Sequence, residues 1–254
     1  MSGDLVWGEE RGQGPRLVPV HEVAITLEAG GWPQALARRD EIDAHFARRQ
    51  AANPHLWNGD ILLLGEHRLA EGVLAGRARQ SDFAAFLWWR DLGWPDLGLI
   101  NVFALAAIEG ADGAFLMGVM GPHTSTAGRI YFPGGTPDLA DVTADGRVDL
   151  EGSVWRELAE ETGLGPADVA HDLGFTAVID GPRLALLRRL VLTDEAEPAR
   201  ARIRAFLAGD AEPELADMAL FRNENDITPQ LAASIAPFAL AYMRHRWQAG
   251  RRGP

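Results

Sequence analysis

The residues best suited to chemistry lie between 154 and 164, where the chain reads Val-Trp-Arg-Glu-Leu-Ala-Glu-Glu-Thr-Gly-Leu. Glu157, Glu160 and Glu161 stand at i, i+3 and i+4, so a helix places their three carboxylates on one stripe. The apolar residues of the same run fall on the opposite side, where they can pack against a sheet. Like charges this close disfavour the helix unless a cation or another partner neutralises them. Because hard oxygen ligands suit Mg²⁺ or Mn²⁺, the three glutamates are predicted metal ligands.

A glycine pair lies upstream of this run, in the sequence Phe132-Pro133-Gly134-Gly135. Its distance from the glutamates lets a glycine turn and a helix face one cavity. A backbone without a side chain can approach a metal closely and turn its carbonyl inward. Gly135 is the better candidate for that carbonyl and completes the predicted metal site.

The two features together resemble the signature of the Nudix hydrolases. The second half of that signature reads Arg-Glu-apolar-x-Glu-Glu-x-Gly-apolar, and Arg156 through Leu164 match it at every position. The resemblance implies an α/β/α sandwich with a mixed sheet, a bound divalent cation and hydrolysis of a phosphoanhydride. It also implies that Arg156 forms a salt bridge that orients a neighbouring glutamate. Otherwise, Arg156 is an exposed helix arginine.

The first half of the signature is irregular in this chain. In the family, a glycine is followed six residues later by a glutamate, which stands eight residues before the arginine. If Gly135 is that glycine, the chain has seven residues too many, and Val148 stands eight before Arg156. We interpret residues 139–148 as a loop insertion that spares the helix. Asp149 or Glu151 would then replace the missing acid.

A further acid, acting as base or ligand, is often contributed in this family by a loop far down the chain. Glu212 and Glu214, just before a predicted strand, are candidates here, and Glu224 is a weaker one. We select Glu214 as the additional catalytic residue. For any one of these glutamates, the alternative is a solvated side chain, because exposed glutamate is the commonest state of that residue.

Three residues are candidates for substrate binding. His123 lies in a polar loop, and Arg129 and Tyr131 alternate along a short strand at the expected rim of the cavity. Without such roles, His123 is an exposed loop residue, and the alternation is that of any strand. Trp88 and Trp89 could form a platform for a nucleobase, but tandem tryptophans on a helix are more typical of packing.

Composition limits the function classes. The chain has 254 residues, 47% of them hydrophobic, which is enough for one core or a core with an accessory lobe. A net charge of −12 argues against a binder of nucleic acid, since phosphate contacts need clustered cations. No cysteine is present, which excludes thiolate ligands and nucleophiles. The start of the chain has no leader-like pattern and no stretch is long enough to span a membrane, so cytoplasmic residence is expected.

Periodicity and turn residues outline the elements and two regions. Strands are expected over 23–27, 60–64, 101–109, 115–120, 129–132, 175–179, 184–192 and 215–221. Helices are expected from 32 to the Asn53-Pro54 stop, over 81–92 with Ser81 as cap, over 152–162, after Pro198, and from Thr228 with Pro229. We place a boundary near the Gly-Trp-Pro break at 93–95. The chain is thereby divided into an N-terminal α+β accessory region, 1–97, and a Nudix-like hydrolase domain, 98–254.

The sequence therefore favours a Mg²⁺- or Mn²⁺-dependent pyrophosphohydrolase that cleaves a nucleoside diphosphate linked to another moiety. Residues 128–135 resemble the end of a coenzyme A diphosphatase pattern, and residues 53–58 resemble nucleotide-sugar enzymes. ADP-ribose is a third candidate substrate. Homodimers are common in the family, so a homodimer is an expected assembly. The alternatives are a Nudix-fold module that senses nucleotides or binds a protein without hydrolysis, and a solvated acidic helix on another α/β domain.

Overall fold

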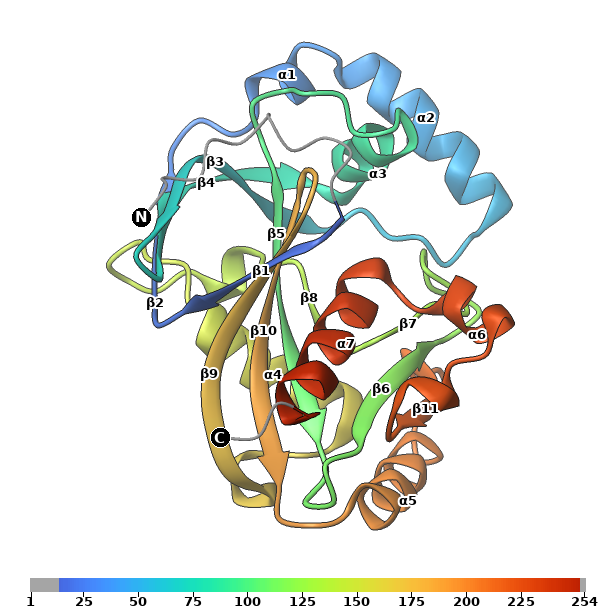
Figure 1. The fold of residues 1–254 in the computed structure, drawn as a ribbon. Helices are drawn as coiled ribbons and strands as arrows, with labels where there is room; N and C mark the ends of the chain where they lie inside the picture. The colour runs from blue at the N-terminus through green and yellow to red at the C-terminus, as the bar shows by residue number, and fades with distance from the viewer. Residues whose placement is uncertain (1–13, 252–254) are drawn as a thin grey trace.

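Strand β5 (Asn101–Glu109) is buried at every residue except the last. A strand that is apolar on both faces must be covered on both faces, which places it inside a layered α/β arrangement. The computed structural model, which describes residues 14–251, shows this arrangement (Figure 1). The segments predicted over 101–109, 115–120 and 215–221 coincide with β5, β6 and β11.

The main sheet is mixed. Its strands, in spatial order, are β1 (Arg16–Val20), β9 (Val169–Asp180), β10 (Arg183–Leu192), β5, β6 (Phe115–Met120) and β11 (Leu215–Phe221). Two short strands join it, β7 (Ile130–Tyr131) beside β6 and β8 (Gly134–Gly135) beside β5. β10 and β5 are parallel, and the other neighbouring pairs are antiparallel.

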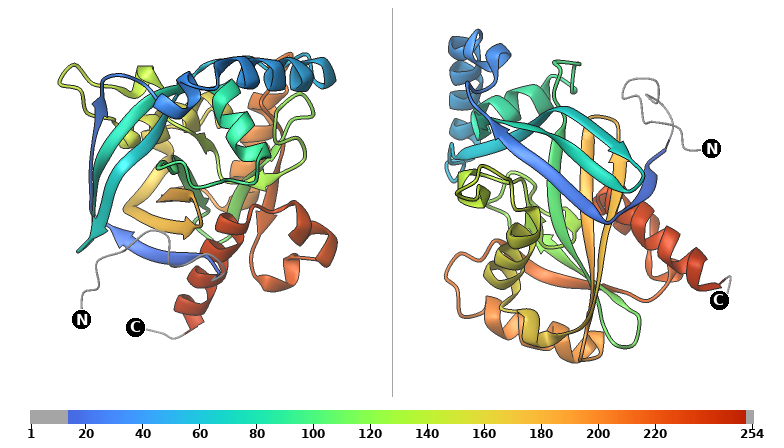
Figure 2. Two further views of the ribbon diagram at one scale, coloured as in Figure 1. Left: turned by 90° about the horizontal axis from the view of Figure 1, so that it is seen from above. Right: turned by 90° about the vertical axis from the view of Figure 1, so that its left-hand side faces the viewer.

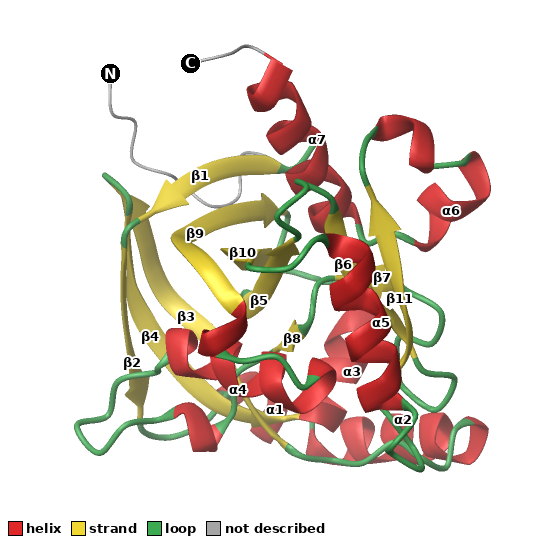
Figure 3. Ribbon diagram, turned by 90° about the horizontal axis from the view of Figure 1, so that it is seen from below, coloured by secondary structure: helices red, strands yellow, loops and turns green. Residues whose placement is uncertain are grey.

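Helices cover both faces of this sheet. Val102, Ala104, Ala106 and Ile108 of β5 belong to the core cluster that contains the apolar face of α4 (Leu150–Thr162). The alternate residues Phe103, Leu105 and Ala107 belong to a second cluster with α7 (Pro237–Arg251). α4 and α7 thus lie on opposite sides of the sheet, as Figure 2 and Figure 3 show. The predicted α/β/α sandwich with a mixed sheet is confirmed.

The N-terminal region is α+β, as predicted. β2 (Glu22–Glu28), β4 (Val73–Asp82) and β3 (Asp60–Ala70) form a three-stranded sheet in that order. It is accompanied by α1 (Pro33–Leu36), α2 (Arg39–Ala52) and α3 (Phe83–Asp91), with a core that contains Trp32, Trp88 and Trp89. The two tandem tryptophans are therefore packing residues.

The N-terminal region and the rest of the chain share structure. β1 pairs with β9 in the main sheet, and Ile25, Leu62 and Leu74 belong to the same core cluster as α4. The boundary at residue 97 stays a prediction.

Several predicted elements differ in extent. The helix expected over 81–92 begins at Phe83 and is capped by Asp82, the last residue of β4, whose side chain accepts from the Ala85 amide. Ser81 lies one residue before the cap. β4 itself was not predicted, since its sequence lacks apolar alternation. The helix expected after Pro198 is α5, which begins before that proline. The last predicted helix, from Thr228, is divided into two helices, α6 and α7. The remaining elements are α5 (Ala196–Leu207), α6 (Pro229–Ser234) and the short 3-10 helices η1 (Leu139–Asp141), η2 (Pro166–Asp168) and η3 (Glu224–Asp226).

The predicted insertion forms a turn that packs on the small sheet. Val142 and Val148 are bridged, and the Val148 amide donates to the Ile25 carbonyl of β2 at 2.9 Å. The Leu27 amide donates to the Gly146 carbonyl at 2.9 Å. Helix α4 is intact beyond it. Among residues 14–251, no helix is both long and apolar enough to cross a membrane.

The first turn of α4 depends on Asp149, whose side chain accepts a hydrogen bond from the Gly152 amide at 2.9 Å. We expect Asp149→Ala to lower the free energy of unfolding by about 1 kcal/mol, because an amide of the first turn loses its acceptor. Asp149→Asn keeps a capping oxygen and should stay close to the wild type. Urea denaturation measures both, and equal stability of Asp149→Ala and wild type would contradict the assigned cap.

Candidate active site

Helix α4 presents its glutamates because its apolar face is fixed against β5. Leu150, Val154 and Leu158 are buried against the sheet, and the helix contacts both β5 and β8. Gly163, at φ 70°, ends the helix in the left-handed conformation that glycine adopts readily. The predicted stripe therefore emerges beside the glycine turn.

At Gly134 the glycine turn is packed too tightly for a side chain. Gly134 has φ 136°, and a Cβ there would lie 2.2 Å from the Ala104 carbonyl oxygen of β5. Its amide donates to Glu161 Oε1 at 3.1 Å. A Cβ on Gly135 would meet the Glu157 carboxyl at 3.7 Å. The structure thus brings Gly134 together with Glu161, and Gly135 together with Glu157.

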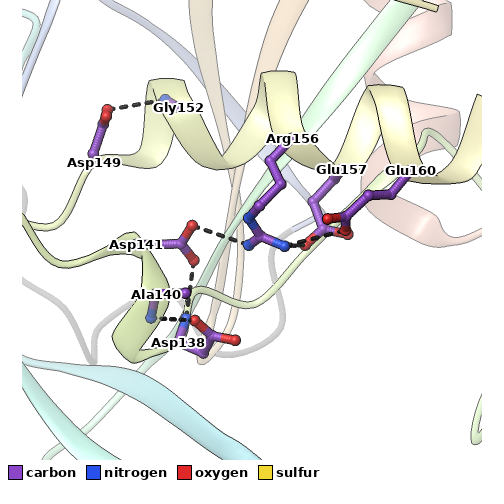
Figure 4. Close-up of polar contacts among 8 residues, drawn as sticks. All are labelled: Asp138, Ala140, Asp141, Asp149, Gly152, Arg156, Glu157 and Glu160. Atoms are coloured by element: carbon purple, nitrogen blue, oxygen red, sulfur yellow. Dashed lines mark hydrogen bonds and ion pairs between the residues drawn. The ribbon is translucent and has the colours of Figure 1, made fainter. Parts of the chain in front are cut away.

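Arg156 holds three carboxylates at once (Figure 4). Its guanidinium contacts Asp141 at 3.0 Å, Glu157 at 2.8 Å and Glu160 at 3.3 Å. The Asp141 side chain is only 3% exposed, so it anchors the arginine from the protein side. These contacts give Arg156 the geometry of a residue that orients neighbouring glutamates.

Asp141 was missed by the sequence interpretation. It stands six residues after Gly135, where the resembled signature has its glutamate, and the surplus residues follow it. The proposed replacements have other partners, since Asp149 caps α4 and Glu151 pairs with Arg188 at 2.8 Å. Counting forward from Gly135 would have identified Asp141.

Glu214 approaches the helix acids from the segment before β11. Burial raises its pKa, while nearby His123 lowers it and Glu160 raises it. The other two candidates form ion pairs with other residues. Glu212 pairs with His55 at 2.9 Å, and Glu224 pairs with Arg244 at 2.6 Å. Of the three candidates, the structure therefore places Glu214 with the glutamates of α4.

The clustered acids repel one another. Burial raises the pKa of Glu157 to about 7; Arg156 opposes this rise, and Glu160, Glu214 and Asp141 add to it. Burial, followed by Glu214 and Glu157, raises the pKa of Glu161 well above its ordinary value. Negative charge is therefore unfavourable here unless a cation is added.

The donor set fits a divalent cation on chemical grounds. Glu161 Oε2 is buried without a hydrogen-bond donor in the described part of the chain, which leaves an acceptor unsatisfied. The oxygens of α4 and Glu214 are hard ligands. Within residues 14–251, however, no three Asp, Glu, His or Cys side chains are already arranged as a preformed metal site. Glu157 and Glu160 are turned toward Arg156 instead.

A cavity of about 690 Å³ adjoins the acids, lined in part by Gly134, Gly135 and Glu214. The three predicted substrate-binding residues His123, Arg129 and Tyr131 also line it. Arg129 donates to the Ala233 carbonyl at 2.9 Å, and no carboxylate of residues 14–251 pairs with it. Burial raises the pKa of Tyr131, so its hydroxyl stays neutral and bonds Thr126 at 3.0 Å.

Comparison with known proteins adds structural neighbours only. No family model and no curated protein matches the chain. A Nudix hydrolase from M. smegmatis is 16% identical, with 60% of this chain and 86% of that chain covered and a TM-score of 0.36. A second, from Nitrosomonas europaea, is 19% identical, with 59% and 90% covered and a TM-score of 0.38. Both are Nudix hydrolases. At this level of sequence identity and TM-score, a structural neighbour cannot assign a function. Any functional assignment therefore rests on the side chains of the site.

The raised pKa of Glu157 predicts a pH dependence of stability. Its carboxyl is protonated in both states below its ordinary pKa of 4.5, but between 4.5 and about 7 the unfolded chain ionises more readily. The wild type should therefore lose stability relative to Glu157→Gln as pH rises through this window. Urea unfolding at pH 5 and pH 8 without divalent cations measures the change. Glu151→Gln, on the same helix, is the control, and a difference between wild type and Glu157→Gln that stays constant with pH would contradict the assignment.

Proposed function

We propose that this chain is a Nudix-type hydrolase that uses Mg²⁺ or Mn²⁺ to cleave the phosphoanhydride of a nucleoside diphosphate joined to another moiety. The observation that carries the proposal is the convergence of Glu157, Glu160, Glu161 and Glu214, which interact electrostatically, beside the Gly134-Gly135 turn. This convergence adjoins a cavity large enough for a small molecule.

The proposed ligands are the three helix glutamates and the Gly135 carbonyl. A divalent cation held there would neutralise phosphoryl oxygens and assist the attacking water. Arg156, anchored by Asp141, acts through the ligands by holding Glu157 and Glu160 in position. Glu214 is the proposed base, since a carboxylate with a raised pKa accepts a proton more readily near neutral pH.

The residues around the cavity suit an anionic substrate. Arg129 has no carboxylate partner among the described residues and can pair with a phosphate. The neutral hydroxyl of Tyr131 and the ring of His123 supply further hydrogen-bonding groups. A nucleotide sugar, ADP-ribose and a coenzyme A derivative all contain the required anhydride. We retain a cytoplasmic location and a homodimer as proposals.

A non-hydrolytic nucleotide-sensing or protein-binding module is the second candidate. It is favoured by the turn of Glu157 and Glu160 toward Arg156 in place of a preformed metal site. The irregular first half of the signature supports it less than the sequence indicated, because Asp141 holds Arg156. Nucleotide binding without product formation in either Mg²⁺ or Mn²⁺ would establish this alternative.

Substitution of the helix glutamates tests the proposed activity. Glu160→Gln or Glu161→Gln should lower turnover on the order of a hundredfold, about 2.7 kcal/mol of transition-state stabilisation, while the fold is kept. Substrates come from a screen of nucleotide sugars, ADP-ribose, dinucleoside polyphosphates, NADH and coenzyme A, with products identified by mass. Glu151→Gln should retain full activity. Unchanged turnover in both site variants would overturn the proposal.

Metal binding is testable apart from activity. Mg²⁺ or Mn²⁺ should raise the Tm of the wild type, because a ligand that binds only the folded state stabilises it. In Glu161→Gln the rise should be small, since the buried Oε2 atom lacks a donor in the described residues and is expected to face the cation. Differential scanning fluorimetry across a metal titration measures this. An equal rise in both proteins would remove Glu161 from the metal site.

A further inference from the structure

The N-terminal region forms a wall of the cavity beside the acids. Residues of the 55–61 segment line it, together with the aromatic rings of Phe83, Phe86 and Trp94. Gly134 and Gly135 of β8, and Glu214 from the segment before β11, line the same space. A ligand in the cavity therefore contacts both parts of the chain.

Trp57 is unusual on this wall because it is 78% exposed. In contrast, Trp32, Trp88 and Trp89 are each no more than 4% exposed and pack in the N-terminal core. An indole left in water costs free energy that a planar ring stacked on it would recover. The position of Trp57, exposed on the cavity wall, suits a residue that binds a ligand more than one that stabilises the fold.

The loop that carries Trp57 is fixed on several sides. Asn53 donates to the His123 carbonyl at 2.9 Å, and Gln50 donates to the Leu56 carbonyl at 2.9 Å. Beyond the tryptophan, Asn58 accepts from the Ala84 amide at 2.7 Å. A loop held in this way presents its side chain with little entropy left to lose on binding.

Gly59 sets the position of the indole. A Cβ at Gly59 would lie 2.2 Å from a carbon of the Trp57 six-membered ring, and the three atoms nearest to it all belong to Trp57. The ring therefore rests against the bare backbone of Gly59. Any larger residue at position 59 must therefore displace the indole of Trp57.

We propose that Trp57 is the stacking surface for the nucleobase of the substrate and that Gly59 is its positioning residue. The inference rests on the proposed function and deepens it by assigning the ring-binding end of the cavity to the N-terminal region. Arg129, which lines the same cavity, supplies a cation for the phosphates of the same molecule. The ligand class is a nucleoside phosphate, with stacking that tolerates several bases.

Binding measurements test the assignment without requiring turnover. AMP, GMP, CMP and UMP are titrated calorimetrically in Mg²⁺ against wild type, Trp57→Ala and Trp57→Phe, with ribose 5-phosphate as the ligand that lacks a base. Trp57→Ala should weaken the tightest nucleotide about tenfold or more, and Trp57→Phe by less than about threefold. Ribose 5-phosphate should bind all three proteins equally. The tightest nucleotide should also quench tryptophan emission in the wild type more than in Trp57→Phe.

A double-mutant cycle tests the role of Gly59. Gly59→Ala should weaken nucleotide binding in the wild type but cause no further loss in the Trp57→Ala background, because the displaced ring is then absent. Leu36→Ala, which truncates an exposed apolar residue that does not line the cavity, should change nothing.

Failure of this inference and failure of the proposed activity are distinguishable. Base-dependent binding that is lost in Trp57→Ala supports the assignment even if no substrate is hydrolysed. Unchanged nucleotide affinity in Trp57→Ala, or ribose 5-phosphate bound as tightly as the nucleotides, overturns the assignment even if hydrolysis is found.

Discussion

The site depends on one cation, the guanidinium of Arg156. Four carboxylates gather where α4 meets the glycine turn and the segment before β11, and burial makes their mutual repulsion costly. Arg156 offsets part of that cost by contacting Glu157 and Glu160 while the buried Asp141 anchors it. Glu161 and Glu214 have no such contact with Arg156. The charge of these two carboxylates is not offset by a contact with the arginine.

The scaffold explains why the acids meet at this point. β5 is buried on both faces, so α4 packs on one side of it and α7 on the other. β8 hydrogen-bonds to β5, and Gly134 lies so close to Ala104 that no side chain fits there. The turn is therefore held on β5 by backbone packed against backbone, and α4 is held on the same strand by its buried apolar side chains. Such a support is rigid, as a site that orients charged groups requires.

Local sequence patterns predicted what local physics controls. The extent and glycine stop of α4 follow from amphipathic spacing and capping, and β5, β6 and β11 follow from apolar runs bounded by turns. The acid expected in the first half of the signature was misplaced because the surplus residues shift the count. Counting back from Arg156 reaches Val148, whereas counting forward from Gly135 reaches Asp141. β4 and the cavity wall at Trp57 depend on pairing and packing between distant segments, which periodicity does not encode.

The turn at residues 142–148 connects the N-terminal sheet to the residues of the site. It hydrogen-bonds to β2 at one edge, and at its base the Asp149 amide donates to the Asp141 carbonyl at 2.8 Å. The backbone of Asp141, the residue that anchors Arg156, is thus supported through this turn by the N-terminal sheet. A chain trimmed to residues 98–254 would keep every acidic residue of the cluster but lose this outside support. The N-terminal sheet therefore forms part of the support of the candidate site.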